Sequence, residues 1–265
     1  KVAICGDLQG RVMTSTAYGD DGLSFGWINK DFFSKQENNP HFNPYGGEDR
    51  FWLGPEGGQF SVFFEKGAEF DLDVWYTPKA VNEQPYTVKS QSENSVVFQD
   101  NLTVKNYSGT EFDMELTREI KMLDKSALNS LVQIPADIPF VAYQSVNSLK
   151  NTGNAKWEKD TGLLSIWILG MFNPSPTTTI VIPVKPGPVD ELGPVVNDEY
   201  FGKIPAERLI VKEDVLFFSG DGEYRSKLGL SPQRVKPIMG SYDATNKVLT
   251  LVHFTIPENA TDYVN

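Results

Sequence analysis

Alternating apolar and polar residues dominate this chain and predict β-strands. Between residues 111 and 122 the apolar side chains recur at every second position, with polar side chains between them. The same period of two predicts further strands at 60–64, 70–76 and 96–104. Other runs are apolar at successive positions and predict strands buried on both faces, at 163–169, 179–184, 215–218 and 248–256.

Turn-forming residues break these strands at short intervals. The chain contains 22 glycines and 17 prolines, which is typical of an antiparallel sandwich. One short helix is expected at about 29–37, and the proline-rich stretch 183–205 predicts a long ordered loop. No linker is evident. The pattern therefore predicts an all-β fold, a large antiparallel sandwich with one short helix, as a single domain over residues 1–265.

Charge and cysteine content narrow the function classes. The chain has 24 basic and 35 acidic residues, a formal charge of −11, which argues against nucleic acid or an anionic membrane surface as a partner. No apolar run reaches the length of about 18 residues that a membrane-spanning helix needs. The single cysteine, Cys5, excludes an intramolecular disulfide. We expect neither a nucleic-acid partner nor membrane insertion.

The stretch from Tyr45 to Phe64 carries the densest chemistry. It reads YGGEDRFWLGPEGGQFSVFF and places charged residues directly beside large aromatic side chains, between two pairs of glycines. Burying a charge against apolar surface lowers the stability of a protein unless the charge is paired or contacts a ligand. The stretch therefore predicts the rim of a polar pocket.

The same stretch also resembles a known family. GGEDRFWLGPEGGQF, together with GRVMTSTAYGDDGLSFGWIN (Gly10 to Asn29) and YRSKLGLSPQR (Tyr224 to Arg234), resembles an uncharacterised family of bacterial secreted proteins related to the aldose 1-epimerases. The resemblance implies a galactose mutarotase-like β-supersandwich. It also implies a periplasmic, extracellular or cell-surface location, with the signal peptide already removed. Residues 262–265 look like the start of another strand. In the aldose epimerases the glutamate that acts as base lies late in the chain, so the resemblance implies that its equivalent would be missing here if the chain is truncated.

Arg118 is the sharpest single candidate for ligand binding. Within the alternating run it stands on the apolar face, where a guanidinium needs a carboxylate or a ligand. One interpretation places it on the floor of a concave polar cleft that binds a sugar. The alternative is a purely structural ion pair, or a side chain turned outward.

The charged stretch supplies four further candidates. A strand places Glu48, Arg50 and Trp52 on one face, where the indole suits a pyranose ring and the guanidinium suits its hydroxyls. The alternative is an internal salt bridge between Arg50 and Glu56. Glu56 lies between Pro55 and Gly57, a rigid position that suits a general acid or base, or else a loop carboxylate that caps backbone amides.

We expect the two histidines to lie in different environments. His253, in VLTLVHFTIP, is expected on a buried strand face with Leu249 and Leu251, either as the acid of an epimerase-type pair with Glu56 or as a core histidine. His41 is expected at the surface. Two distant histidines make a zinc site improbable, so no metal ligands are assigned and no cofactor is expected, although calcium at an aspartate turn stays open.

Arg225 and Lys227 complete the candidate set. They stand two residues apart, so an extended segment presents both on one side. Two like charges side by side suggest an anionic neighbour, which is either the acidic stretch around Glu48 and Asp49 or a uronate or phosphate group on a ligand. The alternative is a solvated basic edge.

Three functions remain open on this evidence. The first is a mutarotase-type enzyme, with Glu56 or a late glutamate as base and His253 as acid. The second is a non-catalytic protein that binds a sugar or oligosaccharide in the same cleft. The third is a surface or interaction protein whose charged cluster is structural.

Overall fold

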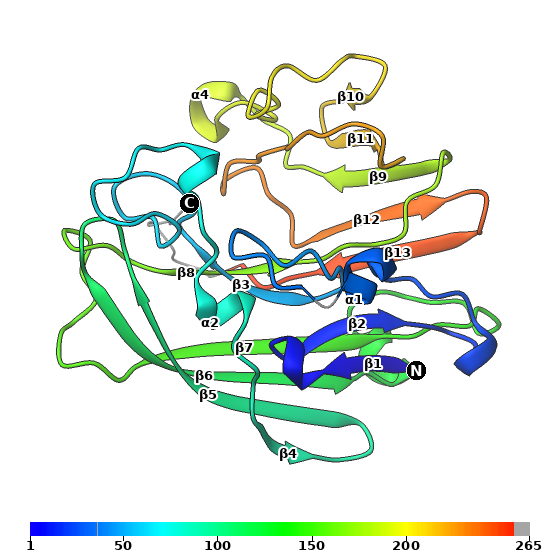
Figure 1. The fold of residues 1–265 in the computed structure, drawn as a ribbon. Coiled ribbons are helices and arrows are strands. Elements are labelled where there is room, and N and C mark those ends of the chain that lie inside the picture. The colour runs from blue at the N-terminus through cyan, green and yellow to red at the C-terminus, as the bar shows by residue number, and fades with distance from the viewer. Residues whose placement is uncertain (36, 257–265) are drawn as a thin grey trace. The chain divides into compact units, whose positions relative to one another are not determined.

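The chain forms two compact units built mainly from antiparallel sheet. The computed structural model describes residues 1–35 and 37–256. Unit 1 runs over Lys1–Asn173 and unit 2 begins at Pro174. Strands dominate both units (Figure 1), which confirms the all-β prediction. The prediction of one domain over residues 1–265 stays a prediction.

Unit 1 contains three antiparallel sheets among its described residues. Strands β1 and β2 form a two-stranded sheet, β3 and β8 form a second, and β4, β5, β6 and β7 form a four-stranded sheet in that order. The strand bounds are β1 Val2–Cys5, β2 Arg11–Ser15, β3 Arg50–Gly54, β4 Val88–Gln91, β5 Ser95–Lys105, β6 Glu111–Met122, β7 Tyr143–Asn151 and β8 Ser165–Leu169.

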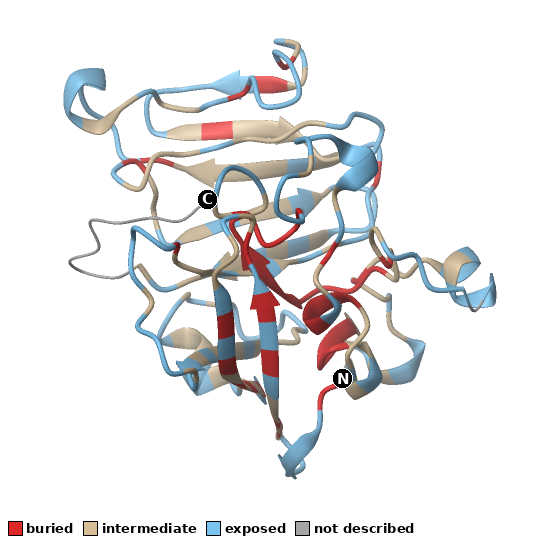
Figure 2. Cartoon of the chain, turned by 60° about the vertical axis from the view of Figure 1, so that its left-hand side comes forward, coloured by how far each residue is buried: buried red, intermediate tan, exposed pale blue. Residues whose placement is uncertain are grey.

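The long strands of unit 1 carry the alternation that the sequence predicts. Strand β6 begins and ends at the expected residues, and its apolar side chains other than Met122 are buried while most of its polar ones are exposed or half-buried. Bands of buried and exposed residues along two neighbouring strands are visible in Figure 2. The buried face of β5 and β6, with Phe98, Leu102 and Met114, packs into the main core, which also receives Phe51 and Phe63.

The short helices of unit 1 lie in the connections between strands. The expected helix is present as α1 (Lys30–Lys35), and Asn29 accepts a hydrogen bond from the backbone N–H of Phe32 near its start. Two more helices were not predicted, α2 (Lys79–Asn82) and α3 (Lys125–Asn129). Single 3₁₀ turns occur at Gly6–Leu8, Gly19–Asp21 and Leu72–Val74.

Unit 2 is a five-stranded antiparallel sheet with a loop packed on one face. The strand order is β10, β11, β9, β12, β13. Their bounds are β9 Thr178–Pro183, β10 Leu209–Val211, β11 Val215–Ser219, β12 Ile238–Asp243 and β13 Val248–His253, and α4 spans Val189–Leu192. Val184 and Ile204, near the two ends of the proline-rich stretch, pack with Leu209 and Leu216 in the core of this unit. The prediction of an ordered loop is therefore confirmed.

Two predicted strands are wrong. Residues 60–64 form turns, because the Ser61 hydroxyl donates to the Glu56 carbonyl and accepts from the Phe63 N–H. Residues 70–76 contain only the 3₁₀ turn Leu72–Val74, where the carboxylate of Asp71 accepts a hydrogen bond from the Asp73 N–H. In both segments a side chain satisfies backbone groups that a strand would have paired across a sheet.

The successive apolar runs form strands as predicted, but they are not buried on both faces. In β13 the residues alternate between half-buried and exposed, and Leu249 is 64% exposed. In β8, Ile166 and Ile168 are exposed as well. Apolar side chains therefore predict the strands here, whereas burial on the second face is absent in the described residues. The expected strand at 262–265 lies outside the described residues.

Candidate functional site

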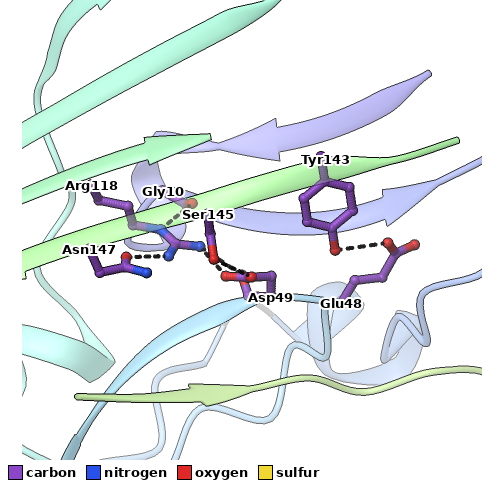
Figure 3. A network of polar contacts seen from close by, with 7 residues as sticks. All are labelled: Gly10, Glu48, Asp49, Arg118, Tyr143, Ser145 and Asn147. Carbon is purple, nitrogen blue, oxygen red and sulfur yellow. Dashed lines mark hydrogen bonds and ion pairs between the residues drawn. The ribbon is translucent and has the colours of Figure 1, made fainter. Parts of the chain in front are cut away.

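Arg118 is fully buried in unit 1 and bonded to protein groups alone. Its Nε donates to the Gly10 carbonyl at 3.0 Å and its Nη1 to Asn147 Oδ1 at 2.6 Å. Its Nη2 contacts both the backbone oxygen and the carboxylate of Asp49, whose other carboxylate oxygen accepts from the Ser145 hydroxyl (Figure 3). Its expected place on the buried face is confirmed. Because no surface of this side chain is exposed, it does not form the floor of an open cleft.

Glu48 lies in the same network and is also buried. Its carboxylate accepts from the backbone N–H and the hydroxyl of Ser15. It also accepts from the Tyr143 hydroxyl at 3.1 Å (Figure 3). Burial, and after it the negative charges of Glu48 and Asp49, raise the pKa of Tyr143 well above its ordinary value. Tyr143 therefore stays protonated and serves as a hydrogen-bond donor to Glu48. These contacts hold Glu48 as a structural residue.

Arg50 is buried and has no carboxylate partner among the described residues. Its Nη2 donates to the Val81 carbonyl at 2.8 Å, and its guanidinium lies 4.5 Å from the ring of Trp52 and 4.8 Å from that of Phe42. Burial, and after it the positive charge of Arg11, lower the pKa of Arg50 to about 8. Arg50 therefore joins β3 to the end of α2 and is not available to a ligand in this structure.

The predicted salt bridge between Arg50 and Glu56 is absent from the ion pairs of the described residues. Glu56 instead accepts a hydrogen bond from Trp52 Nε1 at 2.8 Å. Trp52 is 1% exposed and packs against Phe63, so the expectation that it is a stacking platform for a sugar is wrong. Its polar edge is used to fix the loop carboxylate.

His253 lies on β13 of unit 2, and its expected burial is wrong. The residue is exposed, as are Leu249 and Leu251 on the same face. Glu56 belongs to unit 1 and His253 to unit 2, and the acid/base pairing of these two residues stays a prediction. The other histidine, His41, is half-buried and its ring stacks on Tyr76 at 4.2 Å between centroids.

Unit 2 carries a surface that combines exposed aromatic rings with cations. Tyr200, Phe201 and Tyr224 are 59%, 49% and 40% exposed. Lys227 lies 4.3 Å from the centroid of the Tyr200 ring and Arg225 lies 4.5 Å from that of Phe201. We call this the basic aromatic surface; it consists of Tyr200, Phe201, Arg208, Tyr224, Arg225 and Lys227.

Backbone pairing holds this surface together. The segments that contain Phe201 and Arg225 are joined by two hydrogen bonds between Asn197 and Gly229, at 2.7 and 2.8 Å. The Tyr200 and Phe201 rings meet edge to face, with an interplanar angle of 89°. The rings and their cations therefore have a defined arrangement, although the segments form no regular strand.

Comparison with known proteins identifies a family whose function is unknown. The model of a family described as "Family of unknown function (DUF6786)" matches residues 1–265. The chain belongs to the DUF6786 family. No curated protein and no solved structure matches it.

For this DUF6786 chain the structure divides the predicted site residues into two sets. Glu48, Arg50 and Trp52 are buried with Arg118 in unit 1, whereas Arg225 and Lys227 belong to the basic aromatic surface of unit 2. The partners Tyr200 and Phe201 were not predicted. Two adjacent aromatic residues in a proline-rich loop without apolar periodicity were the signal available in the sequence.

No group of three or more histidine, cysteine, aspartate or glutamate side chains is arranged to hold a metal ion among residues 1–35 and 37–256. Asp221, which begins the turn sequence Asp221-Gly222-Glu223, pairs with Arg208. No helix in the described part of the chain has the length and apolar character needed to cross a bilayer.

Proposed function

We propose that this chain is a non-catalytic carbohydrate-binding protein whose ligand lies on the basic aromatic surface of unit 2. The exposure of Tyr200 and Phe201 is the observation that carries the proposal. Both rings leave about half of their area to solvent while a cation occupies part of each face. Exposed aromatic rings stack on the C–H face of a pyranose, and neighbouring cations donate hydrogen bonds to its oxygens.

The proposal moves the ligand away from the cleft that the sequence suggested. Arg118 and Glu48 are engaged by protein groups, which supports a structural role for the charged stretch of unit 1. The proposal assigns no acid/base pair. A periplasmic, extracellular or cell-surface location is part of the proposal and is supported by the family resemblance of the sequence alone.

A screen of neutral and acidic oligosaccharides by isothermal titration calorimetry tests this function. We expect at least one class to bind, and Phe201→Ala to weaken that binding by about tenfold or more, since an aromatic stack contributes about 1–3 kcal/mol. Tyr18→Ala is the matched control, because Tyr18 is 69% exposed in unit 1 and lies outside the surface. If no sugar binds the folded wild-type protein, the proposed function is wrong.

Two other functions give different results in the same screen. A surface or interaction protein with a structural charge cluster, which the fully bonded Arg118 also favours, binds no sugar. A mutarotase-type enzyme accelerates the interconversion of aldose anomers, and Glu56→Gln abolishes that acceleration while the protein stays folded.

A further inference from the structure

Arg225 lies against an aromatic ring and has no ion-pair partner among the described residues. The side chain is exposed, and its guanidinium carbon lies 4.5 Å from the centroid of the Phe201 ring. No carboxylate of the described residues forms an ion pair with it, although the chain carries 11 more acidic than basic residues. Contact with a ring engages one face of a guanidinium, whereas its N–H donors point outward in the plane. This geometry matches a carboxylate that approaches along the edge.

Lys227 supplies a second cation on the same surface. Its Nζ lies 4.3 Å from the centroid of the Tyr200 ring, and the Tyr200 and Phe201 rings are 4.8 Å apart. The two cations are therefore placed over two rings that touch each other. A ligand that covers these rings therefore lies close to two positive charges, those of Arg225 and Lys227.

Polar atoms of the same surface also remain without partners. Arg208 pairs with Asp221 through Nη2, and its guanidinium lies 5.2 Å from the centroid of the Tyr224 ring. Its Nε is buried and has no hydrogen-bond partner, as is also the case for the Ser226 hydroxyl. Buried polar groups are rarely left unsatisfied, and such groups point to a missing partner.

We propose that the basic aromatic surface recognises an acidic sugar, with the carboxylate of a uronic acid bound by Arg225 and the sugar ring against Tyr200 and Phe201. This inference rests on the proposed carbohydrate-binding function and adds the chemical class of the ligand. Bidentate binding of a carboxylate by a guanidinium provides both affinity and orientation. Lys227 contributes a point charge, and its ammonium group donates hydrogen bonds to sugar hydroxyls.

A comparison of a short oligogalacturonate with its methyl ester tests the inference. The ester keeps the sugar backbone and removes the negative charge. We expect the free acid to bind wild-type protein at least about tenfold more tightly, and Arg225→Gln to reduce this ratio to near one while the ester binds both proteins alike. Affinity for the acid falls as salt is raised.

The control is Lys212→Gln, which removes an exposed cation of unit 2 that lies over Phe217 and outside the surface. It should leave the ratio unchanged, and the thermal unfolding of each variant shows that it is folded. Equal binding of acid and ester by wild-type protein overturns this inference and leaves the carbohydrate-binding function standing. If neither the acid nor the ester binds wild-type protein, and no sugar of the wider screen binds it either, the proposed function is wrong as well.

Discussion

The guanidinium of Arg118 and the carboxylate of Asp49 form an ion pair inside unit 1, with Nη2 2.5 Å from Oδ1 and no part of the arginine side chain exposed. The pair joins β6 to the residue that precedes β3, and the Gly10 carbonyl adds a third segment through Arg118 Nε. A network of this kind fixes how the segments of the unit pack. It explains the charged stretch without a ligand.

Arg118→Met should therefore destabilise the protein strongly. Removing one partner leaves the Asp49 carboxylate buried without its cation, which costs about 3–5 kcal/mol of unfolding free energy. Urea denaturation measures this change. Lys121→Met removes an exposed cation from the same strand and should change the unfolding free energy by no more than about 0.5 kcal/mol. A loss below about 1 kcal/mol for Arg118→Met would contradict the structural role.

Tyr143 should make the unfolding free energy of the protein fall at alkaline pH. Its pKa is raised in the folded state from an ordinary value of 10.0, so its contribution is present below about pH 10 and is lost as the pH rises above it. The unfolding free energy should fall by up to about 1.4 kcal/mol per pH unit from this tyrosine. Urea denaturation at about pH 9 and about pH 11 should show a smaller decrease for Tyr143→Phe than for wild type. An identical decrease in both proteins would show that Tyr143 is not responsible.

Two glycines of the stretch from Tyr45 to Phe64 should differ in how much stability the protein loses when each is replaced by alanine. Gly46 has a φ of +86°, and a Cβ there would lie 2.1 Å from the Trp27 carbonyl oxygen. Gly57 has nothing within 4 Å of an added Cβ. Gly46→Ala should lower the unfolding free energy by at least about 2 kcal/mol, and Gly57→Ala by no more than about 0.5 kcal/mol. Thermal and urea unfolding measure both variants, and equal effects would refute the close approach at residue 46.

The local pattern of apolar and polar residues predicted where most strands lie better than it predicted which segments pair into a sheet. The alternation in β6 identified both ends of the strand and placed Arg118 on the buried face. Residues 70–76 show the same alternation and form no strand, because the Asp71 carboxylate accepts a hydrogen bond from the backbone N–H of Asp73 there. Period alone does not distinguish a paired strand from a segment whose side chains satisfy the backbone locally.

The candidate site was less predictable because it depends on long-range partners. Arg118 was expected to need a carboxylate or a ligand, and only the fold shows that Asp49 fills this need. Arg225 and Lys227 were identified as a pair, whereas their aromatic partners come from a loop about 25 residues earlier in the sequence. The bridge between Asn197 and Gly229 that joins these segments leaves no periodic signal in the sequence.

The most direct test of the account is to map the ligand by NMR, as backbone amide shifts on addition of oligogalacturonate. The account predicts shifts at Tyr200, Phe201, Tyr224 and Arg225, with none at Glu48 or Arg118. Saturable shifts confined to the charged stretch around Glu48 would contradict it and return the ligand site to unit 1.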